Sequence, residues 1–85
     1  MTRFTLHTDP GHGWIEVPLL IVRDLRIHKK ISAYSYKDAR NAYLEEDCDA
    51  ALFVEAFMLK HGRPPNLDHA YSENSFIRNL HPYQS

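Results

Sequence analysis

The residues best able to do chemistry in this chain are carboxylates gathered in one short run. Glu45, Glu46, Asp47 and Asp49 stand directly before an apolar stretch, in "YLEEDCDAALFVEAF" at residues 43–57. Such a run could hold a metal ion, form a catalytic acid cluster, present negative charge to a basic partner, or begin a helix. A helix N-terminus stabilises carboxylates through its unpaired N–H groups and its dipole. Four exceed what one helix end can use, so we expect the surplus to be solvated or to contact a partner.

Metal and catalytic sites are the less favoured interpretations of this run. A calcium loop needs oxygen ligands at alternating positions and a central Gly, whereas the run turns apolar at Ala50. Cys48 is flanked by two carboxylates, which disfavour a thiolate. The histidines are scattered, and no CxxC or HExxH pattern accompanies them. We therefore expect no catalytic residue, no metal and no cofactor, with a site built from His7, His12 and a carboxylate as the alternative.

Tyrosines are a second feature suited to recognition. Tyr34 and Tyr36 share one face of an expected strand, and tyrosine is favoured at protein interfaces. They could equally cover a small core. A further alternative is a nucleic-acid-binding or regulatory module, in which the tyrosines stack on bases beside four basic residues, Lys29, Lys30, Lys37 and Arg40.

Composition indicates one small globular domain over residues 1–85, with 44% hydrophobic and 25% charged residues. Ten basic against eleven acidic residues give a net charge of −1, so no global attraction to nucleic acid or to an anionic membrane is expected. A single cysteine excludes an internal disulfide and favours a reducing compartment. The N-terminus lacks the features of a signal peptide, and the apolar run at 17–22 is too short to span a bilayer. We expect a cytoplasmic protein.

Hydrophobic periodicity predicts the elements that must position these residues. Residues 3–8 and 14–17 alternate in polarity and flank the turn "DPGHG", which predicts a β-hairpin. A short helix at 18–26 and a basic linker should follow, although "VPLLIV" could instead prolong the strand. Further strands are expected at four places: 31–36, 42–45, 66–71 and 75–80. With the main helix at 47–62, the order ββαββα plus C-terminal strands predicts an α+β fold, a small antiparallel β-sheet with two helices packed on one face.

The main helix carries more apolar residues than one sheet can cover. Asp47 or Asp49 could cap its start, and Gly62 could end it in the left-handed conformation. On a helical wheel, one apolar arc contains Leu52, Phe53, Ala56, Phe57 and Leu59. Val54 and Met58 lie beyond that arc, so we expect them to be covered by the first helix, by the C-terminal strands or by a second copy in a homodimer.

Three sequence pieces, "TDPGHGWIEVP", "ISAYSY" and "AYLEEDCDA", together resemble a family of short uncharacterised proteins from phages, prophages and plasmids. The resemblance covers residues 4–60. Relatives in that family often carry Leu-Gly-Ile where this chain has Leu25-Arg26-Ile27.

The resemblance implies a non-enzymatic inhibitor from a mobile genetic element, and anti-CRISPR proteins are the best-known inhibitors of this kind. It implies a host protein complex as partner, such as a CRISPR effector subunit. The acidic residues Glu45, Glu46, Asp47 and Asp49 would then replace phosphates in a nucleic-acid-binding groove, with Tyr34 and Tyr36 as anchors.

Overall fold

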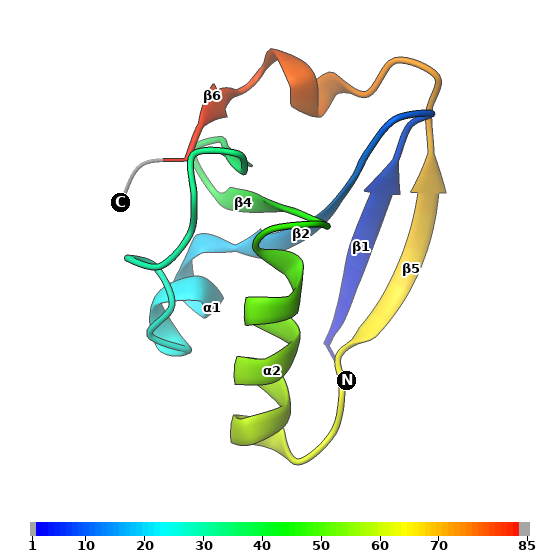
Figure 1. Cartoon of the computed structure of the whole chain (residues 1–85). Coiled ribbons are helices and arrows are strands. Elements are labelled where there is room, and N and C mark those ends of the chain that lie inside the picture. Colours follow the sequence, from blue (N-terminus) through cyan, green and yellow to red (C-terminus); the bar gives the residue numbers. More distant parts are fainter. Residues whose placement is uncertain (1, 84–85) are drawn as a thin grey trace.

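The computed structural model describes residues 2–83 and shows an α+β fold built on one six-stranded sheet (Figure 1). The strand order is β5-β1-β2-β4-β3-β6. The elements, in chain order, are β1 (Arg3–Thr8), β2 (Gly13–Pro18), α1 (Leu19–Asp24), β3 (Tyr36–Lys37), β4 (Asn41–Glu45), α2 (Ala50–His61), β5 (Asn66–Tyr71), the 3₁₀ helix η1 (Phe76–Asn79) and β6 (His81–Pro82).

The predicted hairpin of β1 and β2 is confirmed, with Thr5 opposite Glu16 and His7 opposite Trp14. Asp9 builds its turn. The carboxylate Oδ1 of Asp9 accepts hydrogen bonds from the N–H groups of Gly11 and His12, both at 2.9 Å. An aspartate that bonds to backbone ahead of it is the usual device for fixing a tight turn.

The sheet is mixed, so the prediction of an antiparallel sheet was wrong at β5. β5 pairs in parallel with β1 over six residues, from Arg3 opposite Asn66 to Thr8 opposite Tyr71. β4 is antiparallel to β2, which is antiparallel to β1. The chain leaves β4, crosses through α2 and returns as β5, and such a helical crossover brings the next strand back in the same direction.

Two of the predicted strands were also wrong. Of the 31–36 segment only Tyr36 lies in a strand, as the first residue of β3, because Ser32 and Ser35 bond to Asp49 instead of joining a ladder. The 75–80 segment contains η1, whose start is capped by Ser75 through its Oγ, which accepts from the Ile77 N–H at 3.3 Å.

Both helices pack on one face of the sheet, as predicted (Figure 1). Phe4 of β1 meets two rings of α2 edge to face, at centroid distances of 5.0 Å to Phe53 and 5.6 Å to Phe57. Gly62 ends α2 in the left-handed conformation with φ 75°, as predicted. Arg26, two residues after the end of α1, also has a left-handed φ of 60°, where a glycine would carry no steric cost.

The apolar arc predicted for α2 is confirmed except at Leu59, because Leu52 and Ala56 also pack against the core. The buried residues are Ala50, Phe53 and Phe57, whereas Leu59, placed in the arc, is 89% exposed. Val54 packs partly against the core and Met58 is 46% exposed. The stripe centres on the two phenylalanines because they contact Phe4, and the exposed apolar side chains of α2 are Met58 and Leu59.

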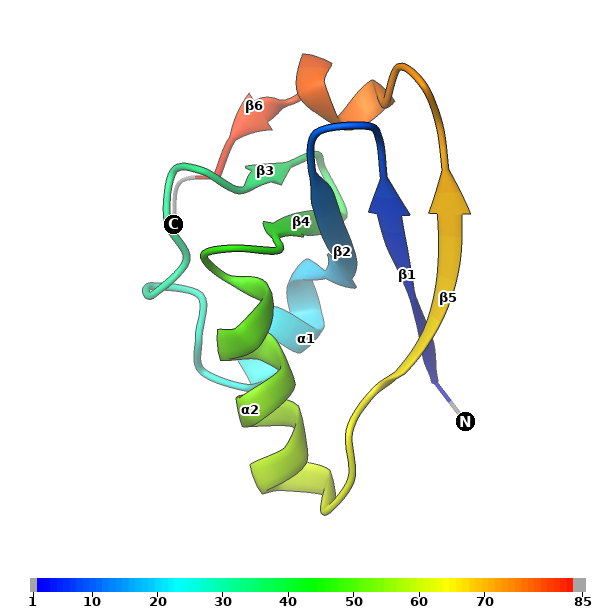
Figure 2. The ribbon, with the colours of Figure 1, turned by 45° about the vertical axis from the view of Figure 1, so that its right-hand side comes forward.

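The other face of the sheet is covered by the C-terminal segment, which sequence reasoning did not anticipate. Ile77 of η1 is fully buried against Trp14 and Tyr43, with Tyr36 and Leu80 at the margin. Figure 2 shows η1 and β6 crossing the molecule on the side away from α1 and α2. This second small core positions the residues of the candidate site.

Candidate functional site

The acidic run divides into two buried and two exposed carboxylates. Glu45 ends β4 and is 6% exposed, and its Oε1 accepts the Asp47 N–H at 2.9 Å. Asp49 is 4% exposed. Its Oδ2 accepts from the Ser32 N–H at 3.0 Å, the Ser32 Oγ at 2.7 Å and the Ser35 Oγ at 2.5 Å. The buried pair therefore stabilises the chain's own loops.

Asp49 occupies the N-cap position of α2, but its side chain does not cap the helix. The interpretation of Asp47 or Asp49 as a capping side chain was therefore wrong for Asp49. Its carboxylate faces the 32–35 loop instead, and this contact holds that loop against the start of α2. Being buried, Asp49 offers little surface to a partner.

Glu46 and Asp47 remain exposed, in the turn between β4 and α2. Glu46 lies against the β1–β2 hairpin, where its N–H donates to the Gly13 oxygen at 2.9 Å. A Cβ placed on Gly13 would stand 2.8 Å from Glu46 Oε2. Gly13, which has no side chain, therefore leaves room for the Glu46 side chain from a distant part of the sequence.

One hollow of about 320 Å³ collects four of the six predicted partner-binding residues, Tyr34, Tyr36, Glu45 and Asp47. Its other lining residues are His12, Trp14, Ala33, Cys48 and Arg78. Tyr34 is 72% exposed, whereas Tyr36 packs edge to face against Trp14 with a centroid distance of 6.3 Å. The remaining two predicted residues do not line the hollow. Asp49 is buried, and Glu46 lies next to the lining residues Glu45 and Asp47 in the turn after β4.

Arg78 is the residue of this hollow that sequence reasoning missed. Its guanidinium binds Asp9 with two hydrogen bonds, Nε to Oδ2 at 2.5 Å and Nη2 to Oδ1 at 3.0 Å. It also lies 5.4 Å from the Trp14 ring centroid, and His12 stacks on that ring at 5.9 Å. The bonds to Arg78 hold the pKa of the Asp9 carboxyl well below its ordinary value. Nothing in the sequence indicates that Arg78 binds Asp9, because the two residues lie 69 positions apart.

Cys48 lines the hollow as an exposed thiol. Desolvation raises its pKa, and a hydrogen bond to Glu45 with the charges of Asp49 and Asp47 adds to the effect. The group therefore stays a thiol near neutral pH, which is unsuited to nucleophilic chemistry.

A second polar group lies on the same sheet face, beneath Phe76. His7 Nε2 is 2.8 Å from Glu16 Oε1, and the Tyr43 hydroxyl donates to Asp38 Oδ2 at 2.8 Å. Burial and the bond to Asp38 hold the pKa of Tyr43 well above its ordinary value. Each of these polar groups already has a hydrogen-bond partner within the sheet face, so we interpret them as structural and not as a binding site.

Residues 2–83 contain neither a cluster of side chains suited to a metal ion nor a helix able to span a membrane. No group of three or more His, Cys, Asp or Glu side chains in that range could hold a metal ion. No helix there has the length and apolar character needed to cross a bilayer.

The basic residues of the alternative hypothesis are spread over several surfaces. Lys29 and Lys30 are exposed after α1, and Arg40 is exposed in the β3–β4 turn. The Lys37 ammonium lies 5.7 Å from the centroid of the Tyr83 ring. Of the two tyrosines in that hypothesis, Tyr34 is 72% exposed, whereas Tyr36 packs on Trp14.

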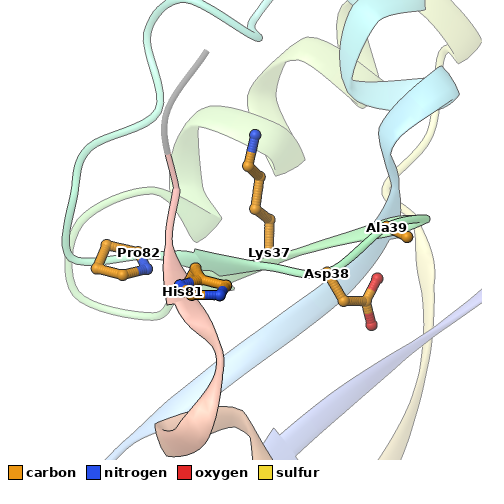
Figure 3. Close-up of a pocket in the computed structure, with 5 residues that line it drawn as sticks. All are labelled: Lys37, Asp38, Ala39, His81 and Pro82. Atoms are coloured by element: carbon orange, nitrogen blue, oxygen red, sulfur yellow. The ribbon is translucent and has the colours of Figure 1, made fainter.

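Another hollow, of about 390 Å³, lies between the β3–β4 turn and β6 (Figure 3). Its polar side chains do not converge. Figure 3 shows the Lys37 side chain and the Asp38 carboxylate pointing to opposite sides of the strand. Asp38 is already occupied by the N–H groups of Arg40 and Asn41, at 2.9 and 2.8 Å. The hollow beside Tyr34 and Asp47 is thus the better candidate.

Comparison of the chain with family models, with curated proteins and with solved structures finds no match.

Proposed function

We propose that this chain is a non-enzymatic protein-binding inhibitor from a mobile genetic element, which binds a basic surface of its target. The observation that carries the proposal is the hollow that joins Tyr34 and Tyr36 to Glu45 and Asp47. These residues come from two segments of the chain, yet they surround one concave surface. Concave surfaces that combine aromatic and charged side chains are typical of recognition sites.

The chemistry of the hollow favours a lysine or arginine side chain of the partner. Asp47 and the neighbouring Glu46 supply exposed negative charge, and Tyr34 supplies an exposed ring face for a cation–π contact. Arg78, the cation that lines the hollow, is bound to Asp9 on two oxygens and so has its charge largely compensated. Acidic surfaces of this kind also steer association with basic partners.

The target class follows from the family resemblance: a nucleic-acid-binding groove of a CRISPR effector. An inhibitor seated there would occupy the lysines and arginines that otherwise bind phosphates. In this proposal Glu46 and Asp47 provide the charges that a partner contacts, while Glu45 and Asp49 hold the surrounding loops.

The test is affinity capture of purified CRISPR effector subunits on the immobilised protein. The informative variant combines Glu46→Lys with Asp47→Lys. Its matched control combines Glu55→Lys with Glu73→Lys, which makes the same charge change at exposed positions outside the hollow. We expect binding to the wild type and the control, and at least a tenfold loss with the first variant.

Equal binding by both double variants would remove the acidic surface from the mechanism. Absence of binding to every effector subunit would remove the target class. Tyr34→Ala provides the second measurement, because the proposal requires the exposed ring as well as the charges.

A further inference from the structure

β5 forms one edge of the sheet and carries few of the features that normally protect an edge. It is last in the strand order, and among residues 2–83 it pairs only with β1. Figures 1 and 2 both show its outer side clear of the other described elements. Natural edge strands are shortened, bulged, covered, or interrupted by Pro or Lys. β5 is six residues long, regular in register, and contains neither Pro nor Lys.

The direction of the backbone groups shows which part of β5 is available. The Ser72 N–H donates to the Thr8 oxygen at 2.9 Å, so Ser72 faces β1. Successive residues of a strand direct their N–H and C=O groups to opposite sides. Leu67, His69 and Tyr71 therefore direct theirs outward, away from β1.

Charge does not protect this edge either. Asp68 is the carboxylate of β5, and Arg3 of β1 binds it with three contacts, from Nε at 3.1 and 3.0 Å and from Nη2 at 2.6 Å. This pairing holds the pKa of Asp68 below its ordinary value. A charge that is compensated within the molecule repels an approaching strand less than a free one.

We propose that β5 pairs antiparallel with β5 of a second copy, which joins the two sheets across a two-fold axis at His69. An antiparallel pair of identical strands is self-complementary, as a two-fold interface requires. With the axis at His69, the outward groups of residues 67, 69 and 71 all find partners. Leu67 then stands opposite Tyr71 of the other copy, a favourable aliphatic–aromatic cross-strand pair.

The alternative axis, at Asp68, is less suited. It would place Asp68 directly opposite Asp68 of the second copy, and like charges in that position are destabilising. The His69 axis instead places Asp68 opposite the small, neutral Ala70. This interface is separate from the hollow of the proposed function, which β1 separates from β5, and from the Val54 and Met58 surface predicted from the sequence.

The first test measures the mass of the full chain in solution at its highest soluble concentration. We expect a dimer that His69→Pro converts to a monomer. The proline removes an outward N–H without touching the β1 ladder, so the monomer should keep the wild-type circular dichroism spectrum. His69→Thr is the matched control, because it retains the N–H while changing the side chain, and it should remain dimeric.

The second test checks the register by cysteine crosslinking in a Cys48→Ser background. His69→Cys should form an intermolecular disulfide, because directly opposite residues stand about 5.5 Å apart between Cα atoms, within the range a disulfide spans. Tyr71→Cys should not, since its two copies would be separated by roughly 13 Å along the strands.

A monomeric wild type would overturn the proposal. So would a dimer that persists in His69→Pro, because that dimer must use another surface. Crosslinking of Tyr71→Cys as fast as His69→Cys would overturn the register. If His69→Pro fails to fold, the crosslinking pair still decides between the outcomes.

Discussion

Replacing Asp49 by Ala tests whether half of the acidic run serves the chain's own structure. Its buried Oδ2 accepts three hydrogen bonds, from the backbone N–H and hydroxyl of Ser32 and from the hydroxyl of Ser35. Ser35 is fully buried, and its Oγ also accepts the Glu45 N–H at 2.9 Å. Removing the carboxylate therefore leaves donors without an acceptor in a region where water enters poorly.

The expected cost is large for a chain of this length. A hydrogen bond to a charged group contributes about 1.5–3 kcal/mol, and three bonds to one atom are not independent. We expect Asp49→Ala to lower the free energy of unfolding by about 3–5 kcal/mol, against a total of roughly 4–13 kcal/mol for a domain of this size. Asp49→Asn retains an acceptor and should cost about 1–2 kcal/mol.

The assay is urea denaturation followed by circular dichroism, with Asp47→Ala as the matched control. Asp47 is the same residue type two positions earlier, but it is exposed, so its replacement should change the free energy by less than about 0.5 kcal/mol. Similar midpoints for Asp49→Ala and Asp47→Ala would refute the reasoning, because burial would then not distinguish the two carboxylates.

Three further outcomes follow from single positions. Arg26→Gly should raise the free energy of unfolding by about 0.5–1 kcal/mol, because the residue has a left-handed φ of 60°; an unchanged urea midpoint would contradict this. Gly62→Ala should lower it by about 1 kcal/mol, since φ is 75° there, and a stabilised variant would contradict it. Arg78 holds the pKa of Asp9 low, so this stabilisation is complete above the ordinary carboxyl pKa and is lost as pH falls. Acid titrations of wild type and Asp9→Asn should show a smaller loss of stability in the variant, and parallel curves would contradict the assignment.

The features predicted correctly from sequence are those that depend on neighbours along the chain. Alternation placed Phe4 and Leu6 on one face of β1, and Ile15 and Val17 on the same face of β2. The dense turn residues between them fixed the hairpin, and Gly62 marked the end of α2. Such signals act over a few residues, so they can be read without knowing the fold.

The features that were missed depend on partners far apart in the sequence. The 31–36 segment alternates in polarity like a strand. Both of its serines, however, donate hydrogen bonds to Asp49, which lies 14 and 17 residues away in the sequence. Arg78 and Asp9 are separated by 69 positions. For the candidate hollow, the sequence named four of the lining residues but did not show which carboxylates face solvent, because that depends on how the turn after β4 directs each side chain.

The division of the acidic run also limits what charge alone can contribute to partner binding. Two exposed carboxylates can form two exposed ion pairs, each worth about 0.2–1 kcal/mol. Together they supply at most about 2 kcal/mol, or roughly a thirtyfold change in affinity. Tight inhibition would therefore require a contact that excludes water, and Tyr34, which lines the hollow and is 72% exposed, is the aromatic side chain suited to make one.

We accordingly expect Tyr34→Ala to weaken target binding more than the neutralising pair Glu46→Gln and Asp47→Asn. An aromatic anchor at the centre of an interface commonly contributes about 2 kcal/mol or more. Titration of the target with each variant, at low and at physiological salt, separates the two contributions, because salt weakens the carboxylate ion pairs but not the contact made by the ring. If the neutralised variant loses more affinity than Tyr34→Ala at physiological salt, charge dominates the contact and the ring is not its anchor.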